Sequence, residues 1–206
     1  EDAIILLKMD IEFIRQGEIY QKCKYAKEIK FALNNKEKAR EILNKFRKEP
    51  LAEDWMPLEV FCERCWKNTT NILDYDKKYE IHYECQCGYS NKFDFRKVGN
   101  ASLLWRLDWP MRWFYEKVDF EPGGKDHSAS GGSFDTGKRI SKAIWDYEAP
   151  TYRAYEWIAI KGGKQFSSSA GVVTLPEEVL EIYEPDVLKF MFSGTQPNKS
   201  FNISFD

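Results

Sequence analysis

The sequence of 206 residues lacks the features of a membrane protein or a secreted protein. It contains no run of about 18 uncharged apolar residues, which argues against a transmembrane helix. Residues 1–8 lack the basic start and the long apolar stretch of a signal peptide. We therefore expect a cytoplasmic protein with no membrane partner. Because the first residue is not Met, we also expect the chain to be a piece of a longer protein.

The sequence also lacks an excess of charge of one sign. It has 31 basic and 33 acidic residues and a formal net charge of −2. Bulk attraction to a polyanion therefore cannot be its main means of binding, and any nucleic-acid contact must be local. Apolar residues make up 43% of the chain and aromatic residues 16%, including seven Trp. This supply is sufficient for a packed core and excludes disorder by composition.

Cysteine is scarce but clustered. Four of the five cysteines form two close pairs, Cys62-x2-Cys65 and Cys85-x-Cys87, on either side of residues 66–84. This spacing is close to that of a zinc ribbon, in which each tight knuckle presents two thiolates to one tetrahedral ion. Gly88 follows the second pair and can adopt the positive φ that such a turn often needs. The pattern predicts a structural Zn²⁺ ion held by these four cysteines.

Two alternatives at the cysteines remain open. The second pair is one residue shorter than usual, so His82 could replace one thiolate, or the four cysteines could be buried free thiols. The remaining cysteine, Cys23, stands alone on a Lys-rich segment and is expected to serve packing.

The expected elements change in character near residue 99. Apolar spacing at Ile11, Ile14 and Ile19 extends a predicted helical region over residues 1–48, and the candidate ribbon follows at residues 58–98. The second half is predicted to alternate helices and strands, which is typical of a parallel α/β sheet. The expected elements are a helix from Trp109, a strand over Lys117–Glu121, a helix capped by Thr136, a strand over Tyr155–Ile160, and helices that begin at Pro176 and after Pro185.

A Gly-rich segment after the first of these strands is the densest group of polar residues. Ligands bind open α/β sheets at the carboxyl ends of strands, where Gly123 and Gly124 would let a ligand approach the backbone. Asp126 could accept hydrogen bonds from ribose hydroxyls, and His127 could bind a polar ligand head. The near-match to a phosphate-binding loop further along is rejected, because Arg139 stands where that motif requires Ser or Thr.

Several longer motifs resemble those of class I lysyl-tRNA synthetases. They are Trp105-Arg-Leu-Asp-Trp-Pro-Met-Arg-Trp113, the run from Phe120 to Lys138, Phe166-Ser-Ser-Ser-Ala-Gly-Val172 and Glu184-Pro-Asp-Val-Leu-Lys-Phe190. The likeness extends back through Pro50–Trp55 and the cysteine pairs, so it covers nearly the whole chain.

The resemblance implies the organisation of the chain. Residues 1–98 would form the connective-polypeptide region, helices plus the zinc ribbon of residues 58–98. Residues 99–175 would be the second half of a parallel Rossmann-type catalytic domain, and residues 176–206 the start of the following helical region. The implied activity is activation of lysine by ATP with Mg²⁺, followed by lysyl transfer to tRNA(Lys).

The resemblance also implies roles for single residues. Trp105, His127 and Tyr155 match the amino-acid pocket, where aromatic faces attract an ammonium group by about 2 kcal/mol when desolvated. Gly124 and Asp126 match the site of the adenosine ribose. Phe166, Ser167, Ser168 and Ser169 match the mobile catalytic loop, although Gln165 and Ser168 replace both lysines of that signature. Ordinary core packing remains the alternative for Trp105 and Tyr155.

One family motif is missing. The His-x-Gly-His signature that holds ATP does not occur, since the only histidines are His82 and His127. We therefore predict that these 206 residues alone do not aminoacylate tRNA. Two other interpretations remain: a non-catalytic zinc-ribbon module that binds RNA, and a glutamyl-type synthetase in which Arg106, Arg112 or Arg153 faces the substrate carboxylate.

Overall fold

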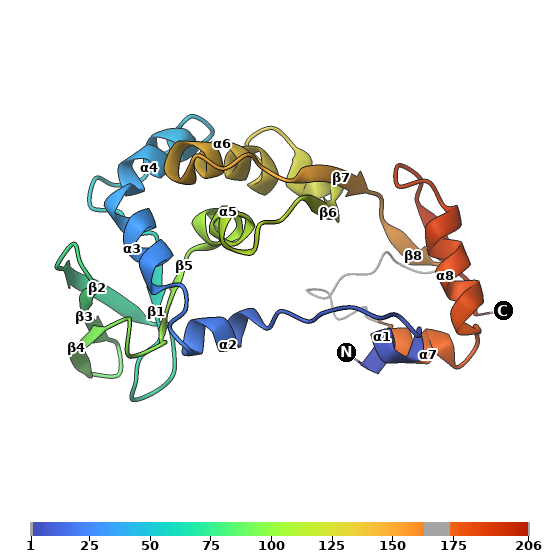
Figure 1. Ribbon diagram of the computed structural model, residues 1–206, viewed down its shortest axis with the longest axis horizontal. Coiled ribbons are helices and arrows are strands. Elements are labelled where there is room, and N and C mark those ends of the chain that lie inside the picture. The colour runs from blue at the N-terminus through green and yellow to red at the C-terminus, as the bar shows by residue number, and fades with distance from the viewer. Residues whose placement is uncertain (1, 163–173, 206) are drawn as a thin grey trace. The chain divides into compact units, whose positions relative to one another are not determined.

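The computed structural model describes residues 2–162 and 174–205 (Figure 1). By its internal contacts the chain divides into two compact units. The larger unit comprises Arg15–Glu121 and His127–Thr151, and the smaller unit comprises residues 2–14, 122–126 and the described part of 152–205. No helix in the described ranges is long and apolar enough to cross a bilayer. These units are defined by contacts and do not coincide with the functional regions implied by the resemblance. The boundaries of those regions at residues 98 and 175 stay a prediction.

The larger unit begins with three short helices, α2 Gln16–Gln21, α3 Ala26–Asn34 and α4 Lys36–Asn44. Helices α3 and α4 are amphipathic, and each buries an apolar stripe in the core. The buried positions are Ala26, Ile29, Ala32 and Leu33 on α3 and Ala39 and Leu43 on α4. The expected helix through Ile11 and Ile14 is wrong, since residues 9–15 are not helical and both side chains are exposed. The helical spacing of these two isoleucines is therefore not accompanied by burial of their side chains.

Two small antiparallel sheets follow. Strand β1 Leu58–Val60 pairs with β5 Ala101–Leu103, and β2 Thr70–Tyr75, β3 Glu80–Cys85 and β4 Ser90–Asp94 form a three-stranded sheet (Figure 1). Along β3, Ile81, Tyr83 and Cys85 are buried, whereas His82 and Glu84 are not. This period of two places one face of the sheet against the core. Strands β3 and β4 flank the second pair of cysteines.

Helix α5, Trp105–Glu116, begins four residues earlier than the sequence predicted. Pro110 lies inside it rather than at its first turn, and therefore leaves one helical carbonyl without its usual donor. Helix α6, Ser133–Trp145, packs on α5, and its N-cap is Gly132. The expected cap at Thr136 is wrong, because its hydroxyl lies inside the helix and donates to the Gly132 carbonyl at 2.8 Å.

Strands β6 Phe120–Gly124 and β7 Thr151–Tyr155 pair with each other, and a 3-10 helix, Lys125–Ser128, follows β6. The first strand is thus shifted by three residues from the expected Lys117–Glu121, and it includes the two glycines that were expected to end it. The strand expected over Tyr155–Ile160 is divided between β7 and β8, Ile158–Ile160.

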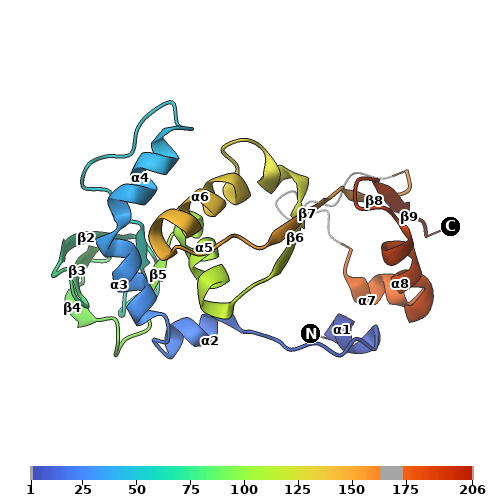
Figure 2. The same ribbon diagram turned by 45° about the horizontal axis from the view of Figure 1, so that its top comes forward.

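In the smaller unit, β8 pairs in parallel with β9, Phe201–Ile203. Helices α7 Pro176–Leu180 and α8 Pro185–Gly194 complete this unit (Figure 2). Helix α7 begins at the predicted proline, and α8 begins at Pro185 itself rather than after it. Val179, Leu188 and Ile203 form the core of this unit, and α1, Asp2–Leu6, contacts α7. The described residues therefore form an α/β arrangement of helices and small sheets.

Candidate functional site

The four paired cysteines converge on one point of the larger unit. Their Sγ atoms all lie within 4.8 Å of one another. Two pairs, Cys62 with Cys87 and Cys65 with Cys85, are each 3.7 Å apart. A zinc–sulfur bond of about 2.3 Å places the sulfurs of a tetrahedral site about 3.8 Å apart. The four sulfurs are therefore spaced as the ligands of one tetrahedral ion.

Local backbone geometry produces the first knuckle. The N–H group of Cys62 donates to the Lys67 carbonyl at 2.9 Å, and the N–H group of Trp66 donates to the Cys62 carbonyl at 2.8 Å. Trp66 has a φ of 60°, which closes this turn with a bulky residue in the left-handed region. The chain is thereby reversed so that Cys62 and Cys65 present their sulfurs on the same side.

The second knuckle has the same design. The N–H group of Cys85 donates to the Tyr89 carbonyl at 2.7 Å, and the N–H group of Gly88 donates to the Cys85 carbonyl at 2.9 Å. Gly88 has a φ of 81°, which confirms the expected positive value. A glycine accepts that conformation without steric cost, so the one-residue spacing of Cys85 and Cys87 still forms a tight turn.

Hydrogen bonds adjust the acidity of these thiols. The N–H group of Cys87 donates to the Cys85 sulfur and lowers the pKa of that thiol to about 6. Burial opposes ionisation of Cys62, but the N–H group of Cys65 contributes to an overall lowering of its pKa. The Tyr89 N–H lowers the pKa of Cys87, yet burial and the neighbouring sulfurs raise it to about 11. The cluster thus favours thiolate at some sulfurs and suits a cation that neutralises the shared charge.

The other two candidates at this site lie elsewhere. His82 points to the opposite face of β3 from Cys85, and its Nε2 atom is 3.2 Å from Ser90 Oγ. Cys23 is not among the grouped ligands, and burial raises the pKa of its thiol. Within residues 2–162 and 174–205, the ligand group consists of the four paired cysteines.

A second group of functional candidates lies along α5. The indole rings of Trp105 and Trp109 stack with centroids 4.9 Å apart, and the ring of His127 meets Trp109 edge-on at 5.6 Å. The ring centroids of Trp109 and Trp113 are 5.0 Å apart, which extends the aromatic row along the helix. Trp105 and His127 are therefore brought together by a residue that sequence reasoning missed. The signal was available, because tryptophans four residues apart share one face of a helix.

The exposed end of this aromatic row already faces a cation. The guanidinium carbon of Arg112 lies 5.3 Å from the ring centroid of Trp105, whose side chain is 44% exposed. Arg112 forms an ion pair with the buried Asp108, which also accepts a hydrogen bond from the Tyr20 hydroxyl. Burial, followed by the charge of Asp108, raises the pKa of Tyr20. The indole face of Trp105 is thus placed to interact with positive charge.

The glycines at the end of β6 lie in the smaller unit. A Cβ atom on Gly124 would lie 2.6 Å from Oδ1 of Asp126, so any side chain there would displace the carboxylate. The Gly124 carbonyl accepts a hydrogen bond of 3.0 Å from the Tyr152 hydroxyl. Gly124 and Asp126 are therefore in direct contact, and the Asp126 carboxylate is exposed.

The predicted residues are divided between the two units. Tyr155 is 49% exposed on β7 in the smaller unit, as are Gly124 and Asp126, whereas Trp105 and His127 belong to the larger unit. A single cavity lined by all of them remains a prediction. Phe166, Ser167, Ser168 and Ser169 lie outside the described residues.

The arginines proposed for a glutamate pocket have other partners or positions. Arg106 donates to the Gly131 carbonyl at 3.0 Å and to Thr136 Oγ1 at 2.8 Å, so it fixes the loop before α6. Arg112 is paired with Asp108, and Arg153 is exposed on β7.

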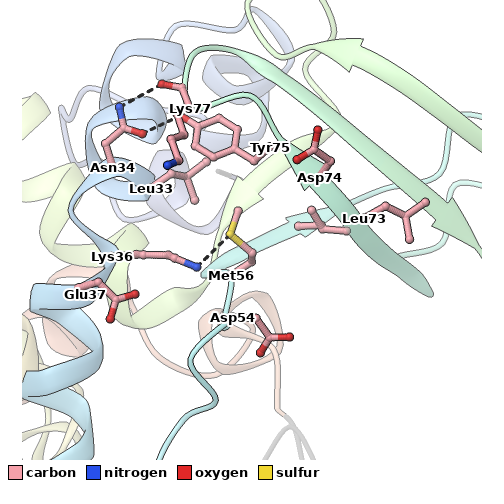
Figure 3. A pocket seen from close by; sticks show the side chains of 11 residues that line it. Leu33, Asn34, Lys36, Glu37, Asp54, Met56, Leu73, Asp74, Tyr75 and Lys77 are labelled. Carbon is pink, nitrogen blue, oxygen red and sulfur yellow. Dashed lines mark hydrogen bonds between the residues drawn. The ribbon is translucent and has the colours of Figure 1, made fainter.

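A further cavity of about 640 Å³ lies between the helices α3 and α4 and strand β2 (Figure 3). Lys36 in its wall donates to the Trp55 carbonyl at 2.7 Å, and Asn34 donates to the Lys77 carbonyl at 3.2 Å. Charged side chains of both signs line the cavity, among them the basic Lys36 and the acidic Asp54 and Asp74. None of the predicted site residues lines it, so it contributes nothing to the candidate site.

Comparison with known proteins gives a consistent result. A family model described as "tRNA synthetases class I (K)" matches residues 1–206. A lysine–tRNA ligase of Borreliella burgdorferi is 49% identical over 207 residues, covering 100% of this chain and 40% of the relative. The corresponding protein of Borrelia garinii subsp. bavariensis is 47% identical with the same coverage.

The similarity extends to archaeal proteins. A lysine–tRNA ligase of Pyrococcus furiosus is 42% identical over 208 residues, covering 98% of this chain and 39% of the relative. The chain spans about 40% of the length of the curated relatives it matches. The family model carries the letter K and these relatives are named lysine–tRNA ligases, so the matches give no support to the glutamyl-type alternative.

Proposed function

The chain belongs to the class I lysyl-tRNA synthetases, and from this premise we propose that it forms part of an enzyme that joins lysine to tRNA(Lys). Two observations carry the proposal. The family model matches residues 1–206, and the lysine–tRNA ligase of Borreliella burgdorferi is 49% identical to the chain. Charging of tRNA would take place in the cytoplasm.

The reaction we propose has two steps. The lysine carboxylate attacks the α-phosphorus of ATP, pyrophosphate leaves, and lysyl-adenylate forms. A hydroxyl group at the 3′ end of tRNA(Lys) then attacks the carbonyl carbon of the adenylate, and AMP leaves. Both steps depend on the positioning of reactants and on stabilisation of charge, so the protein need not supply a nucleophile.

For the lysine subsite we propose Trp105, His127 and Tyr155. The stack of Trp105 on Trp109, with His127 at the edge of Trp109, supports this proposal because it forms a continuous aromatic surface. The ring centroid of Trp105 already lies 5.3 Å from the cationic carbon of Arg112. A lysine ammonium group would be attracted to the same kind of surface by about 2 kcal/mol when desolvated.

For the nucleotide we propose Gly124 and Asp126, with Phe166, Ser167, Ser168 and Ser169 closing over the phosphates. The close fit of the Asp126 carboxylate over Gly124 supports the first pair, because it leaves acceptor oxygens exposed beside a bare backbone. Mg²⁺ would accompany ATP and neutralise phosphate charge when bound.

For the four-cysteine cluster we propose a structural zinc ion. The sulfur spacing of 3.7 Å and the all-thiolate donor set fit Zn²⁺ and leave no open coordination position for water. When bound, the ion would hold the two knuckles together. Cys62, Cys65, Cys85 and Cys87 would be its ligands, and the ion would take no part in lysine activation.

The organisation we propose follows the family. Residues 1–98 would be the connective-polypeptide region with its zinc ribbon at 58–98, residues 99–175 the second half of a Rossmann-type catalytic domain, and residues 176–206 the start of a helical region. The helix-rich α7–α8 segment supports the assignment of residues 176–206, although β9 of this region pairs with β8 of the preceding one.

Lysine-dependent exchange of pyrophosphate into ATP by the full-length gene product tests the proposal. We expect exchange with lysine but not with glutamate, and its loss by more than about tenfold in His127→Ala. The isolated 206 residues should show no exchange, because they lack the His-x-Gly-His motif. Turnover by the isolated chain, or exchange that does not depend on lysine, would contradict the proposal.

A further inference from the structure

A small cavity of about 310 Å³ adjoins the first zinc knuckle, within the larger unit. Its walls come from α2, the knuckle and the segment that enters β5. The lining residues are Gly17, Tyr20, Gln21, Phe61, Trp66, Gly99, Asn100, Ala101 and Ser102. A Cβ atom on Gly17 would meet nothing within 4 Å, so this side of the cavity is open. The volume is sufficient for one planar aromatic ring system.

Two aromatic side chains at this cavity are exposed. Trp66 is 72% exposed and Phe61 is 37% exposed. Core packing therefore does not explain the tryptophan. Trp66 also has a φ of 60°, a conformation that costs a bulky residue about 1 kcal/mol relative to glycine or asparagine. The knuckle thus holds a large aromatic ring in solvent at a position where a smaller residue would give a more stable fold.

One wall of the cavity is fixed by a buried amide. Asn100 is only 7% exposed, and its Nδ2 atom donates to the Phe61 carbonyl at 2.9 Å. This bond fixes the orientation of the amide, because the reverse orientation would place two acceptors together. In the part of the chain that the structure describes, Asn100 Oδ1 has no hydrogen-bond partner. That oxygen has less than 1 Å² of accessible surface, so the amide fixes the Phe61 backbone and does not itself contact a ligand.

Positive charge flanks the exposed ring. Arg64 and Lys67 stand on either side of Cys65 and Trp66 in the sequence, and both side chains are exposed. Aromatic platforms beside basic side chains are the usual means of binding single-stranded nucleic acid, since bases stack and phosphates pair with cations.

We propose that this cavity binds one unpaired base of tRNA, an inference that rests on the proposed function. The base stacks against Trp66 and Phe61. Arg64 and Lys67 contact the adjoining phosphates. The zinc knuckle acquires a direct role in recognition, because it fixes the backbone that presents Trp66.

Binding of fluorescently labelled tRNA(Lys) to the zinc-loaded protein tests the proposal. Trp66→Asn removes the ring but tolerates the positive φ, so we expect unchanged zinc content, equal or greater resistance to urea, and about tenfold weaker binding. Trp66→Phe retains a stacking face and should bind within about threefold of the original protein. Phe31→Ala is the matched control, because Phe31 is an aromatic residue 47% exposed in the same unit but does not line the cavity.

Abasic tRNA probes identify the base. Single unpaired nucleotides are replaced in turn, and one abasic probe should weaken binding to the original protein without further loss in Trp66→Asn. Equal affinity of Trp66→Asn and the original protein would overturn the inference and leave the proposed function intact. Loss of urea resistance in Trp66→Asn without loss of affinity would also overturn it and point to a protein segment on this surface. If the original protein bound no tRNA, this inference and the proposed function would both be overturned.

Discussion

The sulfur atoms of Cys62 and Cys87 lie 3.7 Å apart although 25 positions separate the two residues in the sequence. Each sulfur is presented by its own tight turn, and the strands between them return the second turn to the first. The distance matches the edge of a tetrahedral zinc–thiolate site, about 3.8 Å. The two knuckles therefore present their sulfurs at the spacing of the ligands of one tetrahedral ion.

We predict that the protein binds one zinc ion and depends on it for the fold of the ribbon. Cys85→Ser should reduce the zinc content, measured by metal analysis, from about one per chain to near zero. Because loss of a structural metal is among the most damaging changes, the free energy of unfolding should fall by more than about 4 kcal/mol.

Cys23→Ser is the matched control for this substitution. Cys23 lies in the same unit but outside the sulfur cluster, so its variant should keep its zinc. Equal zinc content in Cys85→Ser and Cys23→Ser would show that the cluster is not the metal site.

Features determined by short stretches of sequence could be predicted. The cysteine spacing led to a cluster that the fold assembles, and Gly88 has the positive φ expected of it. Helices α7 and α8 begin at Pro176 and Pro185 because a proline at the first helical position loses no hydrogen bond. In each case the cause lies within a few residues of its effect.

Features determined by packing could not be predicted from local pattern. Ile11 and Ile14 have helical spacing, yet both are about half exposed and their segment is not helical. Helix α5 extends back to Trp105, and within it Trp109 packs against Phe134 and His127, a contact between segments distant in sequence. The edge contact of His127 with Trp109 likewise depends on the fold, whereas the shared face of Trp105 and Trp109 follows from their spacing alone.

We predict opposite effects for the same substitution at two helical glycines of the larger unit. A Cβ atom on Gly137 would lie 3.0 Å from Cη2 of the fully buried Trp113, so Gly137→Ala should lower the free energy of unfolding by about 1–2 kcal/mol. At Gly17 the Cβ atom meets nothing within 4 Å, so Gly17→Ala should raise it by about 0.5–1 kcal/mol. Urea unfolding measures both. If both substitutions lowered the free energy of unfolding equally, the cost at Gly137 would not come from its close contact with Trp113 of α5.

We predict a pH-dependent contribution from Asp135 to the start of α6. The Gly131 N–H group donates to its carboxylate at 3.0 Å and lowers its pKa, with help from Arg139. A lowered folded-state pKa means that the stabilisation is present above the unfolded-state pKa, near 3.9, and is lost as the pH falls through the folded-state value.

Asp135→Ala should therefore cost about 1 kcal/mol at pH 7, and this cost should decrease below about pH 4. Asp135→Asn serves as the control, because asparagine keeps an acceptor but cannot ionise. At pH 7 its free energy of unfolding should fall less than that of Asp135→Ala. Urea unfolding of the three proteins across this pH range gives the comparison, and a cost for Asp135→Ala that stays constant with pH would contradict the assigned role.

Calorimetric titration of the full-length protein with a non-hydrolysable lysyl-adenylate analogue is the most direct test of the lysine site on α5. The account predicts that the lysyl analogue binds at least about 100-fold more tightly than its glutamyl counterpart. It also predicts that Trp105→Ala weakens the lysyl analogue by about tenfold, through loss of the cation–π attraction. Trp157→Ala, a control tryptophan that is 42% exposed, should leave binding unchanged. Equal binding of the two analogues, or equal binding by the two tryptophan variants, would contradict the account.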